Sequence, residues 1–362
     1  MFRYNKNDRL WIMRHARKAE FLATSRASED SLLLGSHLWV VHNDSYECAD
    51  EQGTSYTTNL TLHACEPEQF ACGNAFCIAM EKRCNVKEDC LDGSDEQNCG
   101  KVMLREGYKK ELAPLTDNGD DVIVDFFLNM FDIEISEPTE TFISKISFTR
   151  NWFDWRLLYK NLKNMAGSKL NTLLTSERKA IWYPRVAFYN VRSADDVKKT
   201  EIRRDILEVI PHDEFAFLAR DNMHIFEGSK NALSLTKEFN IKWKCGYDYH
   251  WYPFDTQVCR MEFASTDSNI ILNPSNLQYN NKISLSCYAI SEIRMCKSVI
   301  AEMRAIVIEV TLERPIVNFL LTVFVPTILL VIISFTARFF VEDYIDMVIQ
   351  VNLTILLVLG TM

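Results

Sequence analysis

The sequence predicts a mostly β protein: an antiparallel β-sandwich, preceded by a small disulfide-rich module and followed by transmembrane α-helices. Three observations support this prediction. Apolar and polar residues alternate in short runs through residues 101–313, six cysteines crowd into residues 65–99, and two apolar segments follow Arg314. We therefore divide the chain into residues 1–64, 65–99, 101–313 and 314–362.

Composition limits the classes of function. The 362 residues include 49 acidic and 40 basic side chains, so a nucleic-acid partner, which needs a basic face, is not expected. Eleven cysteines indicate an oxidising compartment rather than the cytosol. Two glycosylation sequons, at Asn43 and Asn59, agree with that location. The sequence contains no nucleophile–base grouping and no glycine-rich phosphate loop, so an enzyme is not expected.

Residues 1–64 read as the last strands of an extracellular β-domain. Trp39–Asp44 and Leu60–Leu62 are the strand-like runs. Cys48 is left over when the other cysteines are grouped, and the N-terminus lacks the apolar run of about 7–15 residues that a signal peptide needs. We therefore expect the chain to begin inside a longer protein.

Residues 65–99 form a cysteine-rich module. Such a short segment cannot bury a sufficient core, so disulfides and a bound ion are expected to stabilise it. The acidic run Asp92–Glu96 supplies hard oxygen ligands of the kind that Ca²⁺ takes, although a disulfide knot without metal is the alternative. Gaps of 6, 4, 6, 5 and 8 residues separate the six cysteines, Cys65, Cys72, Cys77, Cys84, Cys90 and Cys99.

This pattern resembles a low-density-lipoprotein-receptor class A module. The resemblance implies a protein partner with a basic surface, and the disulfides Cys65–Cys77, Cys72–Cys90 and Cys84–Cys99. It also implies a structural calcium ion held by the side chains of Asn85, Asp89, Asp95 and Glu96 and by the backbone carbonyls of Lys82 and Lys87. Asn85 stands where aspartate is commoner, so a weaker calcium affinity is expected. Asp92 is expected to brace the loop.

Residues 101–313 carry many strand signals and few helical ones. Alternation is clear in Phe142–Thr149 and Ile306–Leu312. Turn signals such as Asp117–Gly119 and Asn273–Ser275 separate aromatic-rich runs. The segment is therefore predicted to fold as an antiparallel β-sandwich.

Two apolar segments follow. Ile316–Thr336 contains 21 residues without a charge. As a helix it would be about 31 Å long, which matches the hydrocarbon core of a bilayer. Pro326 is tolerable in a membrane helix packed by neighbours, although a buried core helix is the alternative. Met347–Met362 is expected to begin a second, pore-lining helix that continues beyond the chain's end.

Four motifs occur in a fixed order after residue 101. They are Trp152–Leu157, Ile181–Pro184, the pair Cys245 and Cys259, and Arg314–Pro315. Taken alone, the cysteine pair would be an ordinary disulfide of a sandwich. In this order the four motifs resemble the Cys-loop (pentameric) ligand-gated ion channels over residues 101–362.

The resemblance implies a gating-coupling site at the membrane surface. The loop between Cys245 and Cys259 has an apolar tip that can rest against helix ends and transmit motion to them. Glu137 falls in the turn where the family keeps an acid facing the pre-membrane arginine, so we predict a Glu137–Arg314 pair. The other predicted coupling residues are Tyr252, Pro253, Phe254 and Asp255, the last of which is expected to brace charges.

Family ligands bind between subunits in a box of aromatic side chains, which suits amines. A disulfide between Cys287 and Cys296 is expected to close the capping loop. Thr266 stands where a box aromatic is expected, so either the ligand is not a simple amine or the subunit supplies an incomplete face. The candidate ligand-binding residues are Tyr189, Thr266, Tyr288, Glu292 and Arg294.

Polar residues line one face of the second apolar segment, and a leucine interrupts them. This pattern suits a water-filled pore with a hydrophobic gate. Carboxylates in Glu342–Asp346 favour cations, so cation selectivity is expected. The predicted pore-lining residues, within an arc of about 80° on a helix, are Asp346, Gln350, Thr354, Leu357 and Thr361.

Together the resemblances imply a subunit of a homo- or heteropentameric channel in the plasma membrane, with its N-terminal domains outside. Its partners would be other subunits, a small extracellular ligand, membrane lipid and a protein bound by the module. Arthropod-type subunits of this kind can carry a laminin-G-like domain upstream, whose tail residues 1–64 resemble. The alternative is a non-channel ligand-binding or modulatory protein derived from a truncated subunit. Further apolar helices encoded after Met362 would favour the channel.

Overall fold

The computed structural model forms two compact units, and each is described here by itself. Unit 1 comprises Met1–Pro114, Trp152–Trp182 and Ile206–Ser234, and unit 2 comprises Leu115–Asn151, Tyr183–Asp205 and Leu235–Met362. The structure describes residues 2–15, 21–26, 33–42, 55–66, 68–115, 119, 121–163, 169–192, 205–212, 217–218, 224–279, 288–300, 302–337, 339 and 345–361. Cys48, Asn43 and Glu342–Tyr344 lie outside these residues.

Unit 1 begins with an antiparallel sheet whose strands follow the chain order. Trp39 and Ala23 are fully buried in it, and Asn59 lies exposed on its last strand. The strands are β1 (Phe2–Asn5), β2 (Leu10–Arg14), β3 (Phe21–Ser25), β4 (Gly35–His42) and β5 (Ser55–Leu62).

The cysteine-rich module of unit 1 has little regular structure. Strands β6 (Gln69–Ala71) and β7 (Cys77–Ala79) pair, and two short 3-10 turns follow, η1 (Met80–Lys82) and η2 (Ser94–Glu96). Its small core is Phe70 packed on Cys72 and Cys90, with the partly buried Ile78 and Met80 against them. The module therefore depends on its cross-links rather than on buried apolar surface.

The rest of unit 1 contains a second sheet, of order β14-β15-β11-β8. Trp152 and Trp182 pack edge to face beside it, with ring centroids 6.2 Å apart. The elements are β8 (Val102–Leu104), β11 (Leu157–Lys160), η4 (Lys169–Asn171), α1 (Thr175–Ala180), β13 (Asp205–Ile210), β14 (Phe217–Leu218) and β15 (His224–Glu227).

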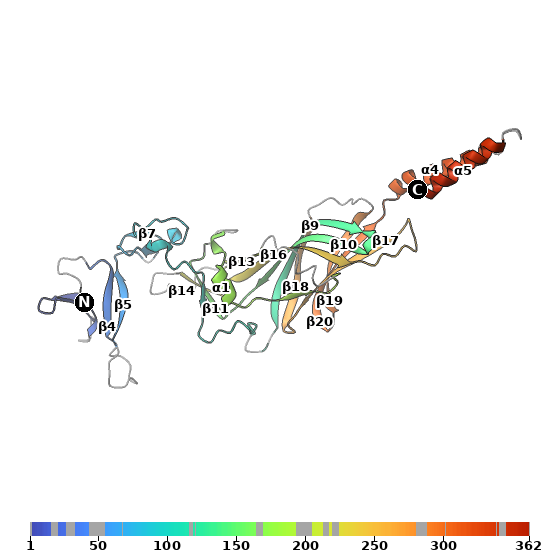
Figure 1. The fold of residues 1–362 in the computed structure, drawn as a ribbon. Coiled ribbons are helices and arrows are strands. Elements are labelled where there is room, and N and C mark those ends of the chain that lie inside the picture. Colours follow the sequence, from blue (N-terminus) through green and yellow to red (C-terminus); the bar gives the residue numbers. More distant parts are fainter. Residues whose placement is uncertain are drawn as a thin grey trace. The chain divides into compact units, whose positions relative to one another are not determined.

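Unit 2 is a β-sandwich (Figure 1), as the sequence predicts. Along most of β9 buried residues alternate with half-buried or exposed ones, and Phe126 of β9 packs on Phe263 of β17 at 5.2 Å between ring centroids. One strand pair, β18 with β9, is parallel rather than antiparallel. One sheet contains β9 (Val122–Ser136), β10 (Thr141–Trp152), β16 (Ala232–Lys244) and β18 (Ile270–Tyr279); the other contains β12 (Val186–Phe188), β17 (Thr256–Ser265), β19 (Ala289–Ile300) and β20 (Met303–Glu313).

Helical segments follow β20. A π-helical stretch, η5 (Leu320–Phe324), separates α3 (Ile316–Phe319) from α4 (Val325–Ala337), where the sequence predicts one regular helix. Pro326 explains the interruption, because its ring displaces the hydrogen bond of the preceding turn. In the part of the chain that the structure describes, no helix is both long and apolar enough to cross a membrane. The last helix is α5 (Ile345–Thr361).

Candidate functional site: a caged arginine between the sandwich and the helices

Arg314 lies where the sandwich ends and the helices begin. Strand β20 ends at Glu313, and α3 begins at Ile316 after Pro315. The Arg314 side chain is 9% exposed, and its guanidinium binds two acids: its Nε is 2.9 Å from Oδ1 of Asp255, and its Nη2 is 3.3 Å from Oε1 of Glu137. Sequence reasoning pairs Arg314 with Glu137, and the structure brings these two side chains together. The more buried partner, however, is Asp255, whose side chain is 1% exposed.

Two tyrosines enclose the same guanidinium. Its Cζ lies 4.4 Å from the ring centroid of Tyr288 and 4.8 Å from that of Tyr252, within cation–π range. Arg314 Nη2 also donates to the Tyr288 hydroxyl at 2.5 Å, and that hydroxyl donates to Oδ2 of Asp255 at 3.3 Å. The cation is therefore held by charge, by hydrogen bonds and by aromatic faces.

The electrostatics of the cage favour the ionised forms of Asp255 and Arg314. Burial alone would raise the pKa of Asp255, but hydrogen bonds from Arg314 and Gln257, together with the arginine charge, hold that pKa below its usual value. Burial likewise opposes the charge of Arg314, yet Asp255 raises its pKa. Burial raises the pKa of Tyr288, so this hydroxyl stays protonated and can donate.

The loop that carries Asp255 is closed by the disulfide Cys245–Cys259, with 5.1 Å between the Cα atoms. Tyr252 at its tip meets Phe319 of α3 edge to face, with ring centroids 5.2 Å apart. Phe254 is 66% exposed, whereas Pro253 after the cis Tyr252–Pro253 bond is buried. The loop thus contacts the first helical segment directly, and the Arg314 cage joins the two at the same place.

Comparison with known proteins identifies the family of the chain. A family model described as the neurotransmitter-gated ion-channel ligand binding domain matches residues 98–322, more than half of the chain. The chain belongs to this family. The low-density lipoprotein receptor domain class A model matches residues 63–99. The predicted resemblances to the Cys-loop ligand-gated channels and to a class A module are therefore confirmed.

Individual relatives agree with the family. The chain is 26% identical over 163 residues to the acetylcholine receptor subunit alpha-type des-2 of Caenorhabditis elegans, covering 45% of this chain and 26% of that protein. It is 24% identical over 226 residues to the glycine receptor subunit beta of Rattus norvegicus, covering 59% of this chain and 41% of that protein. The class A segment is 52% identical over 40 residues to SCO-spondin of Gallus gallus, covering 11% of this chain and 1% of that protein. The chain thus spans less than half of each of these proteins.

Within this family member, the class A module has the three disulfides that its resemblance implies. They join Cys65 to Cys77, Cys72 to Cys90 and Cys84 to Cys99, with Cα–Cα distances of 5.5, 5.9 and 5.5 Å. Asp92 accepts hydrogen bonds from the backbone N–H and the hydroxyl of Ser94, so it braces the loop. The Asp92 carboxylate also lies near the sulfurs of Cys72 and Cys90, but those sulfurs are bonded to each other and cannot hold a metal.

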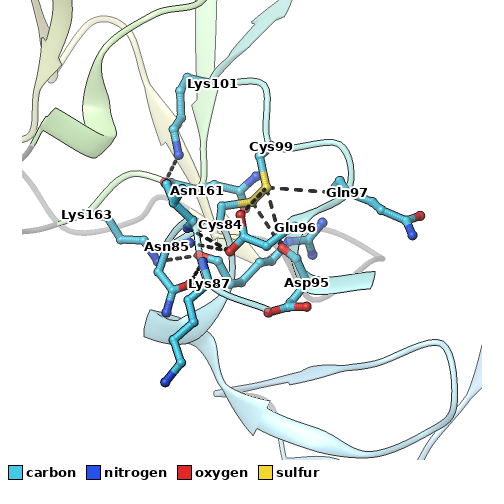
Figure 2. Close-up of a disulfide and its surroundings, with 12 residues drawn as sticks. Cys84, Asn85, Lys87, Asp95, Glu96, Gln97, Cys99, Lys101, Asn161 and Lys163 are labelled. Carbon is cyan, nitrogen blue, oxygen red and sulfur yellow. Dashed lines mark hydrogen bonds between the residues drawn. A yellow bond between two sulfur atoms is a disulfide. The ribbon is translucent and has the colours of Figure 1, made fainter. Parts of the chain in front are cut away.

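Three of the four side chains expected to hold calcium, Asn85, Asp95 and Glu96, lie near the Cys84–Cys99 disulfide (Figure 2). The fourth residue, Asp89, is joined to this group because its N–H donates to Oδ2 of Asp95 at 2.8 Å. Asn85 donates to Oδ2 of Asp89 at 2.9 Å, and Oε1 of Glu96 accepts the Asn85 N–H at 2.7 Å. Asp95 is fully buried, and its Oδ1 has no hydrogen-bond partner among the described residues. A buried, unpaired carboxylate oxygen needs a cation, so these residues fit a calcium ion.

The predicted ligand residues are only partly brought together. Tyr189 is 38% exposed, its N–H donates to Glu262, and its hydroxyl lies 3.7 Å from the sulfur of Met303. Thr266 is exposed four residues beyond Glu262, about 13 Å along the strand. Glu292 and Arg294 form an exposed ion pair in the middle of β19. Tyr288 is fully buried and packs on Arg314 in the cage.

The predicted Cys287–Cys296 disulfide is not found at Cys296, which is an exposed, free cysteine. Cys287 lies outside the described residues. Cys296 is part of β19, Ala289–Ile300, which forms one strand, and the hairpin to β20 turns after it, with Ile300 opposite Met303.

The predicted pore-lining residues lie on α5. Ser334 of α4 donates to Asn352 of α5 at 2.6 Å, and Ile355 is 6% exposed. Leu357 is 70% exposed and Thr354 is exposed. On the helical wheel Asn352 and Ile355 point about 180° from the stripe of Asp346, Gln350, Thr354 and Leu357, so α4 packs on the other face of α5. The side chain of Thr361 lies outside the described residues.

Proposed function

We propose that the chain is a subunit of a ligand-gated ion channel in which the sandwich senses an extracellular ligand and the Arg314 cage transmits its motion to a transmembrane pore. The observation that supports this most is the meeting of three chain segments at Arg314. The disulfide loop, the Glu137 turn and the start of the helices share one buried cation. Movement of any one of these segments must rearrange the contacts of the other two.

The ligand binds at the interface between subunits of a homo- or heteropentamer, on the edge that presents Tyr189 and the β19–β20 hairpin. Tyr189 and Met303 supply an aromatic face and a polarisable sulfur. The assembly lies in the plasma membrane with the sandwich and the module outside. The stripe from Asp346 to Leu357 faces the pore, where its carboxylate favours cations.

The class A module holds one calcium ion in a structural role. Asp89, Asp95 and Glu96 supply carboxylate oxygens, and Asn85 supplies an amide oxygen, with carbonyls from Lys82 and Lys87. When bound, the ion supplies positive charge that compensates the buried Asp95. The module also binds a protein partner through its outer surface.

The proposal is tested by expressing the full-length subunit that contains this chain in oocytes and applying a panel of amines and amino acids under voltage clamp. A ligand-evoked current that reverses near the cation equilibrium potential is expected. Surface-expressed protein that binds a ligand from the panel without any current would instead identify a binding protein without a pore.

A further inference from the structure

The class A module is joined to the following strand without a flexible linker. The last module cysteine, Cys99, is followed by Gly100 and Lys101, and β8 begins at Val102. The carboxylate of Glu177 on α1 accepts the N–H groups of Lys101 and Val102, and its second oxygen accepts the N–H of Leu174 at 2.9 Å. One acidic side chain thus fixes the junction to α1.

Two lysine side chains also connect the module and the junction after it to the segment that follows β11 (Figure 2). The residue Lys101 is 5% exposed, and its ammonium donates to the carbonyl of Asn161 at 2.8 Å. The ammonium of Lys163, just beyond β11, donates to the carbonyls of Glu81 and Arg83 in the module, each at 2.5 Å.

The backbone of Lys163 is itself held in place. Buried Asn171 accepts the Lys163 N–H at 2.8 Å and donates to the Lys163 carbonyl at 2.9 Å. On the module side, the guanidinium of Arg83 packs 4.2 Å over the ring of Phe70, which is the module's core residue. The contact therefore connects a rigid strand end to the centre of the module.

The two carbonyls that accept from Lys163 flank the carbonyl of Lys82, an expected calcium ligand. Arg83 is extended, with φ −64° and ψ 131°. Glu81 and Lys82 belong to the 3-10 turn η1, and Arg83 follows it directly, so the three carbonyls lie on one short stretch of backbone. That stretch would then be ordered both by the Lys163 ammonium and by calcium.

We propose that Lys163 and the module's calcium ion stabilise the same segment, Glu81–Arg83, so that calcium binding and docking of the module on the β11 region strengthen each other. This inference rests on the proposed calcium site. By linkage, whatever Lys163 adds to calcium affinity, calcium adds to the docking contact. The module is then a fixed part of the ligand-binding domain, and extracellular calcium regulates the rigidity of that domain.

Calcium titration of the purified full chain in detergent, by calorimetry after chelator treatment, tests the inference. Lys163→Met removes the donors and keeps an apolar stem; we expect about 10-fold weaker calcium binding, within the range usual for coupled sites. Lys169→Met removes an equal charge from an exposed position six residues away and should change affinity less than about 2-fold.

A calcium affinity that is unchanged or higher in Lys163→Met would have a different physical cause. Lys163 lies in the field of Glu96, so if charge repulsion alone mattered, Lys163→Met would bind calcium as tightly as the unsubstituted chain or more tightly. That outcome overturns the inference while leaving the calcium site intact. Failure of the unsubstituted chain to bind calcium overturns both.

Hydrogen exchange supplies a second readout that needs no folded Lys163 variant. In the unsubstituted chain, calcium should slow amide exchange in Leu157–Lys163 several-fold, and Asp95→Asn should remove this effect. Exchange in Leu157–Lys163 that is indifferent to calcium, in a chain shown to bind it, contradicts the coupling.

Discussion

Replacement of Asp255 by asparagine tests the arginine cage most sharply. The change keeps the shape of the side chain but removes the charge that faces Arg314 at 2.9 Å. Of its two acidic partners Arg314 would then keep Glu137, which is 33% exposed and 3.3 Å away. Leaving a buried cation without its main partner costs about 3–5 kcal/mol. We therefore expect the free energy of unfolding of Asp255→Asn to fall by about 3 kcal/mol.

A matched ion pair elsewhere in unit 2 serves as the control. Arg260 and Glu309 face each other across β17 and β20, with Nε 3.0 Å from Oε1, but the Arg260 side chain is 58% exposed. Exposed pairs contribute about 0–1 kcal/mol, because water screens the charges. Glu309→Gln should therefore cost less than about 1 kcal/mol, although its contact distance is nearly the same.

The assay is urea unfolding of the purified chain, followed by tryptophan fluorescence, on a double-mutant cycle of Asp255→Asn and Arg314→Gln. We expect a coupling energy of about 2 kcal/mol or more between the two positions. A coupling below about 0.5 kcal/mol, equal to that of the Arg260–Glu309 cycle, would refute the argument that burial makes this pair strong.

The contribution of Asp255 to the free energy of unfolding should fall at acid pH. The pKa of Asp255 is lower in the folded chain than its unfolded value near 3.9, so the folded state binds fewer protons. Its contribution to stability is complete above about pH 4 and is lost as the pH falls through the folded pKa. Asp255→Asn should therefore show a smaller loss of stability than the unsubstituted chain between about pH 4 and pH 2.

Three further predictions concern neighbouring parts of the chain. Tyr288→Phe keeps the ring over Arg314 but removes its hydroxyl bonds; it should cost about 1–3 kcal/mol in urea unfolding, and no loss would show that the hydroxyl is dispensable. Replacing both Cys245 and Cys259 by serine opens the loop and should cost about 3 kcal/mol in the same assay; an unchanged midpoint would contradict this. Asp95→Asn should abolish the rise in melting temperature that calcium causes, whereas exposed Asp92→Asn should keep it; equal loss in both would place the ion elsewhere.

Much of the cage could be predicted from the sequence, because local sequence features mark the segments that form it. The order of the cysteine pair, Arg314 and Glu137 indicates which segments meet, because each is tied to a turn or a strand end. The choice of Asp255 as the more buried partner of Arg314 depends on how the loop packs, which spacing does not encode.

Cys296 shows what the cysteine spacing does not encode. Two cysteines nine residues apart predict a closed loop that contains Tyr288, whereas Cys296 is a free cysteine within the continuous strand β19 and Tyr288 packs on Arg314. A continuous strand separates residues by about 3.3 Å each. The number of residues between the cysteines could not reveal that the hairpin turns only after Ile300.

The most direct measurement of the central claim is the ligand-evoked current of the full-length subunit carrying Asp255→Asn, Arg314→Gln or both, against Glu309→Gln as control, at equal surface expression. If the caged arginine couples the sandwich to the pore, each cage variant shifts the half-maximal ligand concentration by at least about 10-fold, and the double variant is no worse than the single ones. Currents from the cage variants that match those of Glu309→Gln would contradict the account.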